Sequence, residues 1–148
     1  MFINLLGYAF IASQAFFYLL AMTSVQRDLT APAYIEFRNL IDAKLSVSLR
    51  IVYYTVLLTS IVLCVLTFRN TASLCFITSV IACIALWVDV FVMMKGNMPI
   101  NHLMHSWTPD DHPDNWHEYR AEWLRYYRLR QVAAITGFTS LVAGAVFS

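Results

Sequence analysis

The stretch TASLCFITSVIACIALWVDVFVMM, residues 71–94, decides the fold because Asp89 is its only charged side chain. An α-helix needs about 20 apolar residues to cross a hydrocarbon core about 30 Å thick. Three further apolar segments lie at about 2–22, 51–68 and 131–147. Inside lipid the backbone must satisfy its own hydrogen bonds, so each segment is predicted to be helical. The sequence therefore predicts an all-α fold, a transmembrane four-helix bundle, with a single domain over residues 1–148.

The composition agrees with a small integral membrane protein. Of 148 residues, 59% are hydrophobic and 13% charged, whereas a soluble domain has about 25% charged residues. This excludes a disordered chain, a nucleic-acid binder with a basic face and an ordinary cytosolic enzyme. The three cysteines lie within apolar runs without CxxC spacing, which indicates core residues and not a disulfide framework.

The connections between the segments differ in length and charge. Segments 23–50 and 95–130 hold every Lys and Arg except Arg69. The positive-inside rule then puts these long connections in the cytoplasm and both termini outside, most simply in a cytoplasmic (inner) membrane. We expect the second helix to begin near Pro32 and the last near Asp114 or Asn115, where start signals stand.

Small and weakly polar residues recur at helical spacing and are expected to face the bundle interior. They are Gly7, Gln14, Tyr18 and Ala21 in the first segment, Tyr53, Ser60, Cys64 and Thr67 in the second, Cys75, Thr78, Ala82, Ala85 and Asp89 in the third, and Ala133, Gly137, Ser140 and Gly144 in the fourth. The same faces suit oligomer contacts, and sequence alone does not separate the two uses.

Asp89 has two interpretations. A carboxylate within a membrane segment is costly, about 2.5–3.5 kcal/mol at the centre, and so requires a partner or a role. One interpretation is a structural ion pair with Arg120, Arg128 or Arg130. The other is a carboxylate that acts as a base or orients a ligand.

Polar residues gather after Asp89. Gly96 and Pro99 are expected to end the third helix, with Asn97 and Asn101 either capping the turn or holding a carbonyl or phenol oxygen. Four histidines follow: His102, His105, His112 and His117. Solvated or capping histidines are the favoured interpretation, no cofactor and no metal is expected, and a haem or metal carrier through His102 and His105 is a third hypothesis.

Aromatic and basic residues precede the last segment. Trp116, Arg120, Trp123 and Arg130 share a helix face. Membrane-surface anchoring explains such a ridge by physics alone. The other interpretation is a site that stacks on a flat aromatic ligand and bonds its anionic groups.

The stretch Asn97-Met98-Pro99-Ile100-Asn101 is followed, in sequence order, by Trp116, Arg120, Trp123 and Arg130. In this series the chain resembles the DUF1772 or anthrone-oxygenase-like family of small four-helix membrane proteins. Its characterised branch oxidises anthrones with dioxygen, without metal or flavin. The resemblance implies Asp89 or His102 as the base, with Arg120 and Arg130 stabilising the oxyanion. It also implies that Asn97 and Asn101 hold substrate oxygens and that Trp116 and Trp123 stack on the rings. Family members often carry a histidine where this chain has Tyr127, so Tyr127 is expected to contact substrate.

Two further hypotheses concern the chain as a whole, and the first is the one we favour from the sequence. One is a membrane-embedded oxidoreductase acting on a flat phenolic, anthrone- or quinone-like substrate. The other is a non-catalytic bundle that stabilises a larger membrane complex, with a homo-oligomer or membrane-protein partner. An enzyme requires Asp89, Asn97, Asn101 and Arg130 to converge on a cavity that admits a ligand. A stabilising subunit ties these residues to one another and leaves no void.

Overall fold

The computed structural model describes all 148 residues, and its regular structure is entirely helical. The first helical rod comprises α1 (Phe2–Phe17), a π-helical turn (Tyr18–Met22) and α2 (Thr23–Asp28). The second is α3 (Ala31–Thr67). The third comprises α4 (Leu74–Val92), a π-helical turn (Met93–Asn97) and α5 (Met98–Met104), and the fourth is α6 (Trp116–Phe147).

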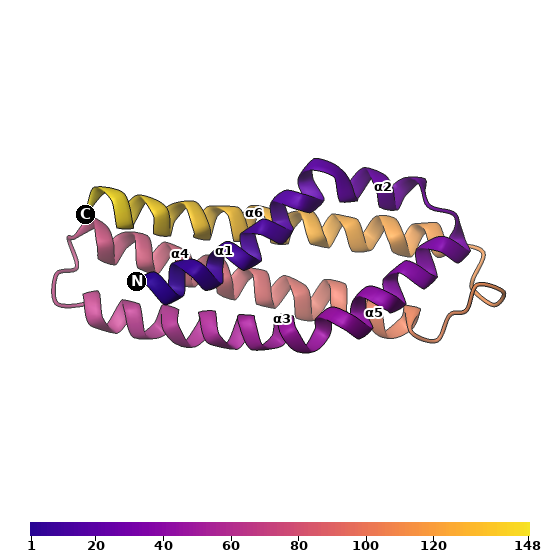
Figure 1. Ribbon diagram of the computed structural model, residues 1–148, viewed down its shortest axis with the longest axis horizontal. Coiled ribbons are helices and arrows are strands. Elements are labelled where there is room, and N and C mark those ends of the chain that lie inside the picture. Colours follow the sequence, from indigo (N-terminus) through magenta and orange to yellow (C-terminus); the bar gives the residue numbers. More distant parts are fainter.

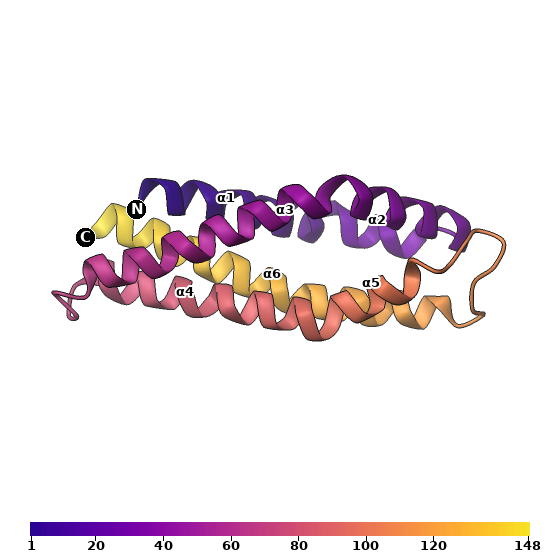
Figure 2. The ribbon, with the colours of Figure 1, turned by 90° about the horizontal axis from the view of Figure 1, so that it is seen from below.

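The four rods form an elongated bundle (Figure 1). Both termini and the turn between α3 and α4 lie at one end, here named the turn end, and α2, α5 and the loop before α6 lie at the opposite, arginine-rich end (Figures 1 and 2). All four rods are long and apolar enough to cross a membrane. The predicted all-α four-helix bundle is confirmed.

The predicted starts of two helices are also confirmed. Thr30 has extended backbone angles and Pro32 lies in the first turn of α3, where its missing N–H is tolerated. Asn115 precedes α6. The third rod begins three residues later than expected, at Leu74, because the Ser73 hydroxyl accepts a hydrogen bond from the Phe76 amide at 3.2 Å and caps α4.

The prediction that Gly96 and Pro99 end the third helix is wrong. The rod continues to Met104 through the second π turn, which contains Gly96. A Cβ on Gly96 would lie 2.3 Å from Cγ of Tyr126, so glycine allows α6 to approach closely here. Pro99 lies in the first turn of α5, directly after the π turn has displaced the regular hydrogen-bond pattern.

Small residues bring α4 and α6 together as predicted. Thr78, Ala82, Ala85 and Asp89 are buried on α4, and Ala133, Gly137 and Gly144 are buried on α6. A Cβ on Gly144 would clash with the Thr78 hydroxyl of α4, and a Cβ on Gly137 would clash with the Tyr8 hydroxyl of α1. These small faces therefore set how closely the rods approach.

The interior face predicted for the first rod is confirmed at Tyr18, at Gly7, where a Cβ would meet Val56, and at Gln14, which lines a cavity beside Asp89, but it is wrong at Ala21 and incomplete. Ala21 is exposed, whereas Asn4 and Tyr8 are buried. Asn4 faces inward because its Nδ2 donates to the Val56 carbonyl at 3.3 Å and to the Ser60 hydroxyl at 2.8 Å. The Tyr8 hydroxyl donates to the Ala82 carbonyl at 2.8 Å. Polar groups that need partners in lipid thus determine this face.

The core has two parts. One apolar cluster lies toward the turn end, around Tyr8, Val56 and Leu86. A second, largely aromatic cluster lies at the arginine-rich end, around Tyr34, Trp123 and Tyr127. Between them, residues 43–48 of α3 are exposed without exception, so α3 leaves the bundle over this stretch. The molecule therefore packs as two zones joined by long helices.

Candidate functional site

A buried triad lies where α3, α4 and α6 meet. Arg130 donates from Nε to Oδ1 of Asp89 at 2.6 Å. The hydroxyl of Tyr53 donates to Oδ2 of the same carboxylate at 2.5 Å, and Nη2 of Arg130 donates to the Tyr53 oxygen at 3.0 Å. The three side chains thus close a ring of hydrogen bonds, named here the closed triad.

The closed triad compensates charge within the apolar part of the bundle. Asp89 is 1% exposed and Arg130 9%. Removing one such ion from water costs several kcal/mol, which good geometry and additional hydrogen bonds must offset. Both carboxylate oxygens of Asp89 accept a hydrogen bond, and Tyr53 supplies the additional partner. Of the alternatives open for Asp89, the ion pair with Arg130 is present.

A small cavity borders the closed triad. Its volume is about 10 Å³, and its lining includes Gln14, Asp89, Tyr127 and Gln131. A single water needs about 10–15 Å³, so this cavity has room for about one water and none for a flat ring system. The cavity beside the Asp89 carboxylate is therefore too small for an organic substrate, and the carboxylate itself already bonds Tyr53 and Arg130.

A second polar network lies at the arginine-rich end. Oδ1 of Asn101 accepts from Nη2 of Arg38 at 2.9 Å and from Nε1 of Trp123 at 2.8 Å. The guanidinium of Arg38 also lies over the indole of Trp123, 4.1 Å from the ring centroid. Nδ2 of Asn97 donates to the Trp123 carbonyl at 3.0 Å. Trp123 is thus the centre to which α3, α5 and the second π turn are tied; we name this set the tryptophan network.

Stacked rings connect the two networks. Trp123 and Tyr127 stack with centroids 5.0 Å apart and planes 8° apart. Tyr18, from the first π turn, lies 4.4 Å from the Tyr127 centroid. On its other side, Tyr127 lies 5.3 Å from the guanidinium carbon of Arg130. Tyr127 therefore contacts both the closed triad and the tryptophan network.

Four buried polar atoms near the aromatic cluster have no hydrogen-bond partner. They are Oε1 of Gln26, the hydroxyl of Tyr34, Nε of Arg38 and Oδ1 of Asn97. Each of these residues is at most 3% exposed. An unpaired buried polar atom costs about 1–3 kcal/mol, so water or a bound polar molecule is expected to satisfy such atoms. Two of these atoms, Nε of Arg38 and Oδ1 of Asn97, belong to the tryptophan network, which therefore still has an unpaired donor and an unpaired acceptor.

The remaining predicted site residues lie elsewhere. Arg120 donates from Nη1 to the carbonyls of Gln26 and Leu29, at 3.0 and 2.8 Å, and lies 4.5 Å from the Trp116 centroid. It therefore fixes the end of α2 against α6. His102 is exposed, with its ring 6.3 Å from that of His105.

The histidines are spread over the surface of the arginine-rich end. Nε2 of His105 lies 3.2 Å from Oδ2 of Asp42, and Nδ1 of His112 lies 3.3 Å from the Thr108 carbonyl. No group of three His, Cys, Asp or Glu side chains lies close enough together to hold a metal ion. The histidines that the structure pairs thus contact protein partners, as capping or surface residues do.

The structure divides the predicted site in two. Asp89 and Arg130 come together in the closed triad, and Asn97, Asn101 and Trp123 come together in the tryptophan network. Sequence reasoning missed three contributors, Tyr53 as a partner of Asp89, Arg38 and Gln26. The sequence pattern could have identified Arg38 and Gln26. Both lie in the first long connection, and each follows an apolar or aromatic residue, Tyr34 or Met22, by four positions, which places it on the same helix face.

Comparison of the chain with protein-family models, curated proteins and solved structures finds no match.

Proposed function

We propose that this chain is a non-catalytic membrane bundle that serves as a subunit or stabiliser of a larger membrane assembly, with its arginine-rich end in the cytoplasm. The closed triad is the observation that supports this proposal most. The two residues best suited to reaction chemistry, Asp89 and Arg130, bond to each other and to Tyr53, beside a cavity with room for about one water. This arrangement ties three helices together and leaves no place for substrate at the carboxylate.

The outer face of α6 supports a helix partner. Thr136 and Thr139 are exposed on a largely apolar span, and both are small enough for close approach of another helix. In membranes, helices associate through small and hydroxyl-bearing residues because lipid supplies no hydrophobic driving force. We therefore assign the α6 face around Thr139 as the contact with the assembly.

Substitution on this face tests the proposal. Thr139→Leu adds bulk on the contact face without touching the closed triad. Thr55→Leu makes the same change at an exposed position of α3 and is the matched control. Membranes extracted in mild detergent are separated by native electrophoresis. Wild type and Thr55→Leu are expected in a species larger than the monomer, and Thr139→Leu as the monomer. Monomeric wild type contradicts the proposal.

A second function, an oxidoreductase of flat phenolic, anthrone- or quinone-like molecules, is favoured by the unpaired atoms of the tryptophan network. Nε of Arg38 is a free donor and Oδ1 of Asn97 a free acceptor. A phenol with a neighbouring carbonyl offers the complementary acceptor and donor. The resemblance to the DUF1772 or anthrone-oxygenase-like family rests in part on residues of this network, Asn97, Asn101 and Trp123.

Dioxygen uptake separates the two functions. Purified protein in lipid nanodiscs is mixed with anthrone, and oxygen consumption is compared with empty nanodiscs. The proposed function predicts equal rates. The oxidoreductase predicts a faster rate with protein that is lost in Asn97→Ala, whose side chain bonds Trp123, and retained in Thr55→Leu. Such a result overturns the non-catalytic proposal.

A further inference from the structure

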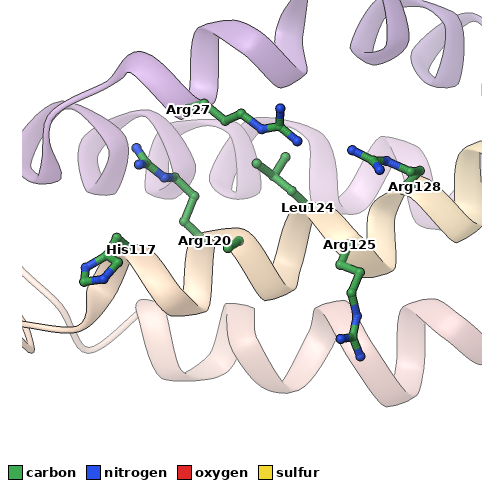
Figure 3. A pocket seen from close by; sticks show the side chains of 7 residues that line it. Arg27, His117, Arg120, Leu124, Arg125 and Arg128 are labelled. Atoms are coloured by element: carbon green, nitrogen blue, oxygen red, sulfur yellow. The ribbon is translucent and has the colours of Figure 1, made fainter.

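A groove between α2 and α6 is lined mainly by cations. Its volume is about 390 Å³, and its lining includes Arg27, Arg120, Arg125, Arg128, His117 and Leu124. Figure 3 shows Leu124 between the side chains of Arg27 and Arg128, whereas the guanidinium of Arg125 points toward the opposite side of α6. We name this feature the arginine groove. Two helices from distant parts of the chain thus contribute its charges.

The arginine groove carries positive charge without acidic partners. No carboxylate lines it, and no ion pair involves any of its four arginines. Arg120 is held in place by the two backbone carbonyls to which Nη1 donates. Arg27 and Arg128 are exposed, and no hydrogen bond is formed by either side chain. Their donors are available to an anion.

The arginine groove lies at the boundary between the polar and apolar parts of the chain. Arg128 stands one helical turn before Val132, which is 62% exposed on the apolar segment of α6. Arg27 follows the apolar segment of the first rod. In a bilayer, this boundary is the level of the lipid headgroups, and acyl chains pass the exposed apolar side chains next to it.

We propose that the arginine groove binds the phosphate of an anionic phospholipid headgroup. Guanidinium groups match phosphate oxygens in bidentate hydrogen bonds, and Arg27 and Arg128 approach a phosphate from two helices. The cationic lining favours a headgroup with net negative charge over a zwitterionic one, whose ammonium group it repels. Bound lipid would join α2 to α6 at the membrane surface.

Lipid titration tests the assignment. Detergent-solubilised protein is titrated with dioctanoyl phosphatidylglycerol, dioctanoyl phosphatidylcholine and glycerol phosphate, and binding is followed by thermophoresis. The double variant Arg27→Gln, Arg128→Gln removes two charges from the groove. The control Lys44→Gln, Arg50→Gln removes two exposed charges from α3. Circular dichroism establishes that each variant remains folded.

The wild type and the control are expected to bind phosphatidylglycerol more tightly than either other ligand. The groove variant is expected to bind it roughly thirtyfold more weakly, since each of the two cations removed contributes about 1 kcal/mol near an anionic lipid surface. Equal weakening in the control would assign the effect to overall charge and overturn the site. Equally tight binding of glycerol phosphate would make it a soluble-anion site and overturn the lipid assignment.

Discussion

Arg130 and Arg38 are both buried arginines, one in the closed triad and one in the tryptophan network, and their surroundings differ. Arg130 bonds a carboxylate and a phenol that also bond each other. Arg38 bonds an amide oxygen, lies over an indole, and leaves Nε without a partner. Its ion pair with Asp42 is long, at 3.4 Å. In the closed triad, within the apolar part of the bundle, the carboxylate, the phenol and the guanidinium bond one another; the tryptophan network, toward the polar end, leaves capacity for other molecules.

The largest effect is expected from Arg130→Ala. The substitution leaves the Asp89 carboxylate buried without its cation, a change that typically costs about 3–5 kcal/mol. The free energy of unfolding is measured by titrating the protein with dodecyl sulfate in mixed micelles and following circular dichroism. Arg128→Ala, an exposed arginine on the same helix, is the control and is expected to change stability by less than about 0.5 kcal/mol. Similar values for both variants would contradict a structural closed triad.

A smaller effect is expected from Asn101→Ala. It removes the acceptor shared by Arg38 and Trp123, and unpaired buried donors cost about 1–3 kcal/mol. Asn101→Asp keeps the acceptor and adds a charge opposite Arg38, so it is expected to retain wild-type stability. The same titration measures both. Equal loss in the two variants would mean that the shape of the side chain, and not its oxygen, is required.

Two glycines sharpen the comparison of packing. A Cβ at Gly137 meets Tyr8, which is fully buried, whereas a Cβ at Gly96 meets Tyr126, which is half-buried. Overpacking costs about 1–3 kcal/mol where neighbours cannot move. Gly137→Ala is therefore expected to lower the unfolding free energy by about 1–2 kcal/mol, and Gly96→Ala by less. The reverse order would show that the aromatic cluster is the more rigid zone.

The smallest effect is expected from His105→Ala. The His105 side chain is 54% exposed in its contact with Asp42, and exposed pairs contribute about 0.2–1 kcal/mol. A change in unfolding free energy below about 0.5 kcal/mol is expected in the same micelle assay. A loss as large as that of Asn101→Ala would place this pair within the tryptophan network.

Hydropathy and small-residue spacing were sufficient to predict the helical rods and the packed faces of α4 and α6. Long apolar segments and residues such as Ala82 and Gly137 carry that information locally. The face of the first rod was predictable only in part, since Tyr18 faces inward as expected whereas Ala21 is exposed. Asn4 and Tyr8 face inward on account of partners on α3 and α4 that only the assembled bundle provides.

The candidate site was predictable as residues but not as an arrangement. The pairing of Asp89 with Arg130 was one of the alternatives, since a lone intramembrane acid requires a cation. The participation of Tyr53 depends on how α3 crosses α4, which spacing along one helix does not encode. The second π turn was also not predictable, because Gly96 and Pro99 usually end a helix. Here the helix continues, and Tyr126 of α6 packs against Gly96, a contact that only the folded bundle reveals.

The central claim is that Asp89 and Arg130 act as one structural unit and not as independent reactive groups. A double-mutant cycle with Asp89→Asn, Arg130→Gln and the combined variant measures their coupling through unfolding free energies in mixed micelles. The account predicts that each single variant is strongly destabilised and that the combined variant recovers about 2–3 kcal/mol. Additive effects, with coupling near zero, would contradict it.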